Sequence, residues 1–204
     1  MLLNKGRTPP FIFFTAGVSV MVKKIFTFYC SWIDQLVRIV GQSVSILMPL
    51  LALVIAFEVG SRYLFNHPTI WAYDTSLFLS AYLVGLGGAY AYQKKTHINV
   101  DILYLSVSPK TKRVFDVLTG LLAMFFMFIL MMIAYEKFGE ALQFNYRKMS
   151  NWAPPTHHFW MMLVVSGALV SLQITSNMVK DIYYVINGYP LIAVPEEEDS
   201  EDGN

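Results

Sequence analysis

Four stretches of the chain have the run of apolar residues that predicts membrane-spanning helices. They cover about residues 39–57, 71–92, 114–135 and 159–178. At about 1.5 Å of rise per residue, a helix of about 20 residues crosses the roughly 30 Å of hydrocarbon in a bilayer. The second stretch ends abruptly at Lys94 and Lys95, which indicates where the bilayer stops. We therefore predict an all-α integral membrane domain with four transmembrane helices over residues 39–186.

A different pattern precedes the first span, over residues 21–38. Apolar side chains recur there at helical spacing on one side and charged or hydroxyl side chains on the other, with Phe28 as the one exception. This pattern is typical of an amphipathic helix in the headgroup plane, which we predict here. The alternative is that these residues form the first turns of the next span. The residues assigned to the membrane interface are Lys23, Lys24, Trp32 and Arg38.

The two ends of the chain differ from the membrane domain. Residues 1–20 contain an apolar run that is too short to span and lacks a convincing small-residue cleavage site. They form either an N-terminal extension or a segment upstream of a true start at Met21. Residues 187–204 carry most of the clustered acidic side chains, and we predict a disordered acidic tail there.

The second span carries small residues on one face. Ala81, Gly85 and Ala89 recur every four residues, which allows another helix backbone to approach closely. Asp74 lies eleven residues before Gly85, close to three turns, so it projects from the same side. The acid either binds at an interface or contacts water and headgroups at the span's end. The residues assigned to a partner-subunit interface are Trp71, Asp74, Ala81, Gly85, Gly88 and Ala89.

Prolines and a charged pair predict local features of the helices. Pro49 lies inside the first span, where we expect a kink that faces protein. Glu58 and Arg62 are four residues apart and are predicted to form an ion pair at the membrane edge. Pro154 and Pro155 stop one helix and favour the start of the next.

The connection between the second and third spans is the strongest basic loop. Within it His97 and Asp101 are four residues apart, a spacing that suits a mutual hydrogen bond or two ligands of a metal. Two ligands do not make a metal site, so we predict a contact that organises the loop. We assign no catalytic, cofactor-binding or metal-binding residue. The residues assigned to loop organisation are Arg62, Asn66, Pro68, His97 and Asp101.

Composition and charge support the same class of protein. Hydrophobic residues make up 55% of the chain and charged residues only 14%, outside the usual balance of a soluble protein. The N-terminal segment, the second connection and the tail hold eleven lysines and arginines, against four in the first and third connections. This bias predicts that both termini are cytoplasmic. The single cysteine, Cys30, excludes an intrachain disulfide, and we assign it no role.

Two motifs carry a resemblance to a known family. RYLFNHPTIWAYD is followed after one span by GGAYAYQKKTHINVD, within residues 56–101. This combination resembles the small membrane subunit, the DctQ-type small permease, of tripartite ATP-independent periplasmic (TRAP) transporters. Two departures are visible: Asp74 stands where that family usually has Glu, and Ser166-Gly167 where many members have Pro-Gly.

The resemblance implies that this chain works with partners. In that family a soluble periplasmic protein captures an organic anion, and a large membrane subunit moves it inward together with sodium. The small subunit is thought to brace the large permease and to help dock the binding protein. The resemblance therefore implies a multi-pass protein of the bacterial inner membrane, in contact with lipids, with no cofactor of its own and no nucleic-acid partner. We hypothesise that this chain has no substrate or ion site.

A redox role is the alternative. The chain could be the membrane anchor of a complex that holds haem or quinone. Its four histidines, however, lie near span ends or in connections, which disfavours a haem held between two helices at mid-membrane. A thiol oxidase linked to quinone is disfavoured by the single cysteine.

Overall fold

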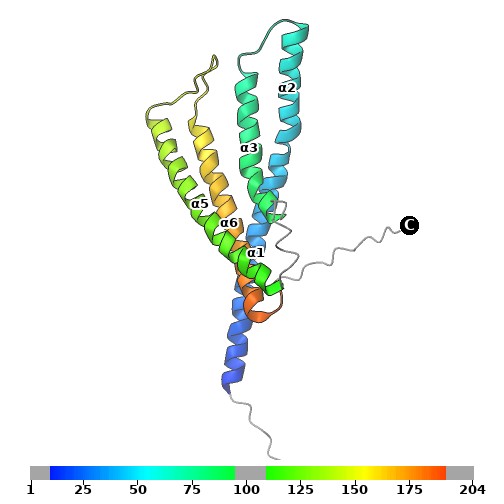
Figure 1. Cartoon of the computed structure of the whole chain (residues 1–204), viewed down its shortest axis with the longest axis vertical. Helices are drawn as coiled ribbons and strands as arrows, with labels where there is room; N and C mark the ends of the chain where they lie inside the picture. The colour runs from blue at the N-terminus through cyan, green and yellow to red at the C-terminus, as the bar shows by residue number, and fades with distance from the viewer. Residues whose placement is uncertain (1–9, 95–108, 192–204) are drawn as a thin grey trace, which may run out of the picture.

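The computed structural model describes residues 10–94 and 109–191, and these ranges form helices joined by loops, with no β-strand (Figure 1). The predictions for His97, Asp101 and the acidic tail beyond residue 191 lie outside the described residues. The helices are α1 (Pro10–Ser45), α2 (Leu47–Leu64), α3 (Ala72–Gln93), α5 (Pro109–Gln143) and α6 (His157–Asn187).

The first two helices are separated only at Ile46. Pro49 has no N–H to donate to the carbonyl of Ser45, four residues earlier, and its ring crowds that carbonyl. Just before the break, the Ser45 hydroxyl donates to the Gln42 carbonyl at 2.7 Å. The helix is thus interrupted near Pro49, as predicted, but Pro49 itself is exposed, so a kink that faces protein stays a prediction.

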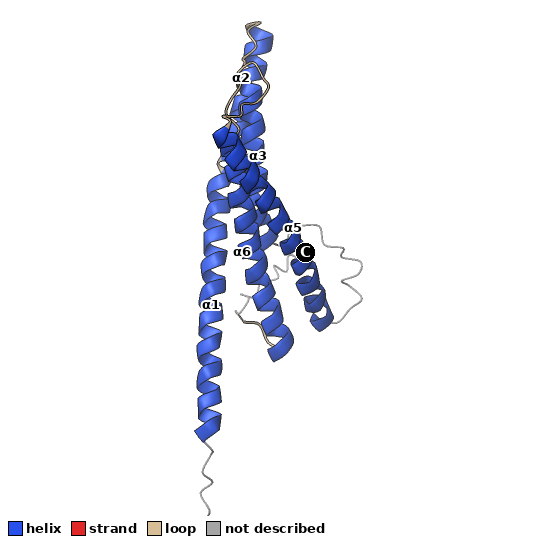
Figure 2. Cartoon of the chain, turned by 90° about the vertical axis from the view of Figure 1, so that its left-hand side faces the viewer, coloured by secondary structure: helices blue, strands red, loops and turns tan. Residues whose placement is uncertain are grey.

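The structure differs from the predicted boundary between an interfacial helix and the first span. α1 runs unbroken across residues 38 and 39, because no proline interrupts its backbone hydrogen bonds between Pro10 and Pro49. Figure 2 shows α1 continuing in the same direction past the ends of α5 and α6. The stretch 21–38 is therefore the lower part of one long helix.

The helices are arranged around α6. It packs against α5, α3 and α1, while α3 also packs against α1 and α2. α2 and α5 lie at the two sides of the bundle, as Figure 1 shows. The loops 65–71 and 144–156 lie at one end, here named the loop end, and the other end, which contains Gln93, is named the opposite end.

The buried core is formed where α1, α3 and α6 meet. Ile33 and Val37 of α1 pack with Ala89 of α3 and Leu169 of α6. Cys30 is also buried on this face of α1. One face of α1 is therefore covered by the chain's own helices.

Much of the outer surface is apolar. α2 has no buried residue, and α5 exposes large side chains such as Leu122 and Phe126 along its length. Exposed apolar surface on this scale indicates a covering of lipid or protein. Three helical stretches are long and apolar enough to cross a membrane: Lys23–Leu64, Thr111–Gln143 and His157–Asn187. α3, the predicted second span, is not among them.

Candidate functional site

Asp74 forms an ion pair inside the chain at the loop end. Only 1% of Asp74 is exposed, and its Oδ1 lies 2.6 Å from Lys148 Nζ. The Ser150 hydroxyl donates to Oδ2 at 2.5 Å. Lys148 Nζ also lies 5.1 Å from the ring centroid of Tyr73 and 5.8 Å from that of Phe78. The acid that was predicted to meet a partner or water therefore ties the start of α3 to the loop between α5 and α6.

The loop 144–156 has a fixed shape that presents Lys148. The Lys148 N–H donates to the Pro154 carbonyl at 2.9 Å, and the Thr156 N–H donates to the Tyr146 carbonyl at 3.0 Å. Ala153 adopts a left-handed backbone with φ of 49°. These bonds fold the loop back on itself, so Lys148 reaches Asp74 from a closed hairpin-like turn.

The small-residue face of α3 does contact a helix, and that helix belongs to the same chain. The Ser166 hydroxyl donates to the Gly85 carbonyl at 2.5 Å. A Cβ at Gly85 would lie 2.8 Å from Met162 Sδ, so a larger residue there would displace the Met162 side chain from its place between α3 and α6. Ala89 is buried in the core described above. The close packing is as predicted, but Gly85 and Ala89 are used within the chain.

The other residues of the predicted partner interface keep accessible surface. Trp71 is exposed and stacks on Phe57, with ring centroids 6.0 Å apart. Ala81 lines an open apolar hollow of about 420 Å³ between α2 and α3. A Cβ at Gly88 would meet no atom within 4 Å. For these three residues the contact with a partner subunit stays a prediction.

The turn at 65–71 is organised by Glu58. Arg62 Nη2 lies 2.5 Å from Glu58 Oε1, which confirms the predicted pair. Glu58 Oε2 accepts hydrogen bonds from the backbone N–H of Thr69, at 3.0 Å, and from its hydroxyl. Asn66 adopts a left-handed backbone with φ of 55°, followed by Pro68 within the same turn. The paired Glu58 therefore fixes the connection from α2 to α3.

A second polar cluster lies at the opposite end, and sequence reasoning missed it. Asp34 Oδ2 lies 2.5 Å from Lys180 Nζ, and Oδ1 accepts hydrogen bonds from Gln173 at 3.0 Å and Ser176 at 3.2 Å. The Gln93 side chain donates to the Asp34 carbonyl at 2.8 Å. These contacts join α1, α3 and α6. The sequence feature that could have indicated this cluster is the position of Asp34 beside the apolar face of α1.

The described histidines lie at the loop end. His158 Nδ1 is 2.5 Å from the Tyr82 hydroxyl, and His67 lies in the turn after α2. Within residues 10–94 and 109–191, no three or more His, Cys, Asp or Glu side chains form a group that could hold a metal ion. At the predicted membrane interface, Lys23 Nζ lies 5.3 Å from the Tyr189 ring, whereas Lys24, Trp32 and Arg38 are exposed.

Helices with apolar outer surfaces, joined by the ion pairs Asp74–Lys148 and Asp34–Lys180 at the two ends of the bundle, indicate a helical membrane protein. The family of DctQ components of tripartite ATP-independent periplasmic transporters matches residues 51–183, and the chain belongs to this family. It is thus a small permease subunit of a TRAP transporter, as the motifs indicated, and the redox alternative is not supported.

Two proteins of Vibrio cholerae serotype O1 are similar to parts of the chain. The C4-dicarboxylate TRAP transporter small permease protein DctQ is 30% identical over 70 residues, which are 34% of this chain and 30% of that protein. The sialic acid TRAP transporter small permease protein SiaQ is 32% identical over 54 residues, 26% of this chain and 31% of that protein. The aligned stretches thus span about a third of each relative.

Proposed function

We propose that this chain braces the large permease subunit of a sodium-coupled TRAP transporter and helps to dock its periplasmic substrate-binding protein. The sodium coupling resides in the large subunit. The transported substrate is an organic acid, which is supported by the names of the two similar proteins, one for C4-dicarboxylate and one for sialic acid. The complex lies in the bacterial inner membrane, where lipid covers the remaining apolar surface.

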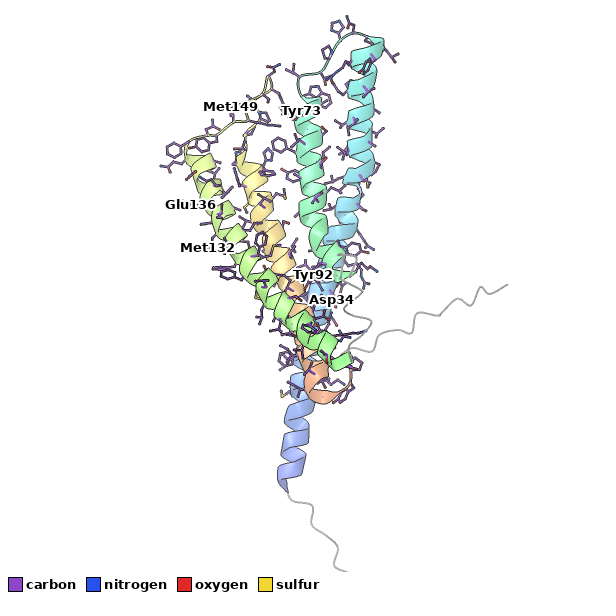
Figure 3. All side chains as sticks on the ribbon, viewed as in Figure 1. Asp34, Tyr73, Tyr92, Met132, Glu136 and Met149 are labelled. Atoms are coloured by element: carbon purple, nitrogen blue, oxygen red, sulfur yellow. The ribbon has the colours of Figure 1, made fainter. Side chains whose placement is uncertain are left out.

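We also propose four spans, with α3 as the second of them in chain order, and both termini in the cytoplasm. Asp, Glu, Lys and Arg are absent from residues 39–57, 75–93, 117–135 and 159–179, four stretches of about 20 residues each. Charged pairs lie beyond these stretches: Asp74–Lys148 at the loop end and Asp34–Lys180 at the opposite end. In Figure 3, Tyr73 and Met149 are labelled toward the loop end and Asp34 toward the opposite end. The 22 residues of α3 are about 33 Å long and run beside α6, which supports a span.

The observation that carries the bracing role is the closure of the bundle between these two charged levels. A Cβ at Gly41 would lie 2.5 Å from Tyr90 Cβ, and one at Gly167 would lie 2.6 Å from Met131 Cγ. With the Gly85 contact, these close approaches fix α1 to α3, α3 to α6 and α6 to α5. The packed unit of α1, α3, α5 and α6 suits a static support for a moving partner.

The experiment is reconstitution of uptake with and without this chain. The chain and the large permease are purified together and separately, and sodium-driven uptake of organic acids is measured in proteoliposomes with the binding protein present. The two subunits together are expected to take up the organic acid, and neither subunit is expected to do so alone. Uptake by this chain alone would overturn the proposal, as would full uptake by the large permease in its absence.

A further inference from the structure

Two cations lie beside the contact between α1 and α3 at the opposite end of the bundle. Gly41 of α1 faces Tyr90 of α3, because a Cβ at Gly41 would lie 2.5 Å from Tyr90 Cγ. Arg38 is three residues before Gly41, and Lys94 is four residues after Tyr90. Since α1 and α3 run in opposite directions (Figure 1), both cations lie about one turn beyond this contact, at the same level of the bundle.

The two cations also lie on the same side of this contact. At about 100° per residue, Arg38 is turned by about 60° from Gly41, and Lys94 by about 40° from Tyr90, in the same rotational sense. Between antiparallel helices, rotation in the same sense moves both side chains to one side of the contact. Both side chains are exposed. We name Arg38 and Lys94 the basic pair.

The basic pair has no carboxylate beside it in the part of the chain that the structure describes. Neither Arg38 nor Lys94 forms an ion pair there, and Lys94 Nζ lies 5.9 Å from the centroid of the Tyr90 ring. Asp34, the only acid of α1, is already paired with Lys180. The only acid of α3 lies at the loop end, where it is paired as well. An anion can therefore bind the basic pair without displacing an acid of either helix.

The basic pair lies where the proposed spans end. Residues 39–57 and 75–93 contain no Asp, Glu, Lys or Arg, so Arg38 and Lys94 are the charged residues that directly follow the hydrocarbon on this side. The phosphate groups of phospholipids lie at this depth, just outside the acyl chains. A guanidinium binds phosphate through two parallel N–H donors, and an ammonium binds it as a point charge. Depth and charge together thus favour the phosphate of a lipid headgroup.

An open strip of α3 leads from Lys94 into the membrane. Gly87 is seven residues, about two turns, before Lys94 on the same face, and a Cβ at Gly87 or Gly88 would meet no atom within 4 Å. Val84 is 70% exposed and lines the apolar hollow between α2 and α3. From Lys94 to Val84 the distance along the helix is about 15 Å, half of the roughly 30 Å of hydrocarbon. The strip is therefore as long as the acyl chains of one leaflet.

We propose that the basic pair binds the phosphate of one anionic phospholipid of the cytoplasmic leaflet, with an acyl chain along the open strip of α3. A headgroup with a net negative charge fits better than a zwitterionic one, because an added ammonium would be repelled by two cations. A free phosphate ion would match the charges but would leave the apolar strip uncovered. The inference rests on the proposed spans, which place Arg38 and Lys94 at the cytoplasmic surface.

Native mass spectrometry of the detergent-purified full chain tests this inference. The chain is titrated with phosphatidylglycerol, which is anionic, or with phosphatidylethanolamine, which is zwitterionic, and it is expected to retain one molecule of the anionic lipid preferentially. Arg38→Gln and Lys94→Gln are each expected to weaken this binding about fivefold, equivalent to about 1 kcal/mol for one basic residue at an anionic headgroup. The matched control is Lys24→Gln, which removes an exposed lysine about four turns before Arg38 and is expected to leave binding unchanged.

Three results of this titration would overturn the inference. They are equal retention of the two lipids, an equal loss of binding in the control variant, and displacement of the lipid by inorganic phosphate, which would assign the basic pair to a free anion.

A photoreactive lipid tests where the acyl chain lies. Phosphatidylglycerol with a diazirine at the end of one acyl chain is expected to label the peptide that contains Val84, and not the peptide that contains Leu122, an equally exposed residue of α5. Labelling of Leu122 alone would contradict the placement along α3. Because the large permease is absent from both measurements, a negative result leaves the bracing role intact. Failure of the uptake experiment would likewise leave the lipid site intact.

Discussion

Removal of the Asp74 charge is expected to destabilise the loop end strongly. Asp74 is almost fully buried and Lys148 Nζ lies 2.6 Å from it, so Asp74→Asn leaves a buried ammonium without its counter-ion. Breaking one side of a buried ion pair typically costs about 3–5 kcal/mol. For a chain of this length, that corresponds to a fall of about 6–20 °C in the midpoint of thermal unfolding.

The assay is thermal unfolding of the detergent-purified chain. The measured quantity is the fraction of protein that stays monodisperse as the temperature rises. The matched variants are Lys148→Met and the double variant Asp74→Asn with Lys148→Met. Because the double variant leaves no unpaired charge, it is expected to recover most of the stability lost in Asp74→Asn. The reasoning is refuted if Asp74→Asn unfolds at the same temperature as the unmodified chain, or if the two single losses simply add in the double variant.

Three further predictions concern packing, topology and the first turn. Gly85→Leu is expected to lower the yield of monodisperse protein sharply because its side chain would enter the space of α6, whereas Gly88→Leu is tolerated; equal yields would contradict the packing. An impermeant maleimide, added to whole cells with a permeabilised outer membrane, is expected to label Met149→Cys but not Lys94→Cys. The reverse result would show that the chain has the opposite orientation. Glu58→Gln is expected to raise the rate of amide hydrogen exchange in the turn 65–71 about tenfold, because the hydrogen bond from the Thr69 N–H loses its charged acceptor. An unchanged rate would argue against Glu58 as the residue that organises this turn.

Local chemistry made several features predictable from the sequence. The Glu58–Arg62 pair follows from four-residue spacing on one helix, and the break before Pro49 follows from a missing N–H. The lack of a Cβ at Gly85 correctly predicted a close helix contact. Each of these depends on neighbours within a turn or on the size of a single side chain.

The features that were not predictable depend on which distant segment arrives. Nothing in the pattern around Asp74 indicates that Lys148 will be its partner. The position of Lys148 depends on the shape of the loop 144–156, and that shape is set by backbone hydrogen bonds within the loop. A small-residue face such as that at Gly85 calls for a neighbouring helix but does not specify the chain that supplies it. Likewise, Phe28 looked anomalous because only one apolar face was expected on α1.

The central place of α6 has a consequence for biogenesis. Among the described helices, α6 is the last to be synthesised, and until then α5 lacks the helix that it chiefly packs against. Asp34 is synthesised long before Lys180, so its ion pair forms only after Lys180 has been added to the chain. A nascent chain that ends before residue 157 therefore lacks the lysine that pairs with Asp34, and the faces of α1, α3 and α5 that pack on α6 stay open.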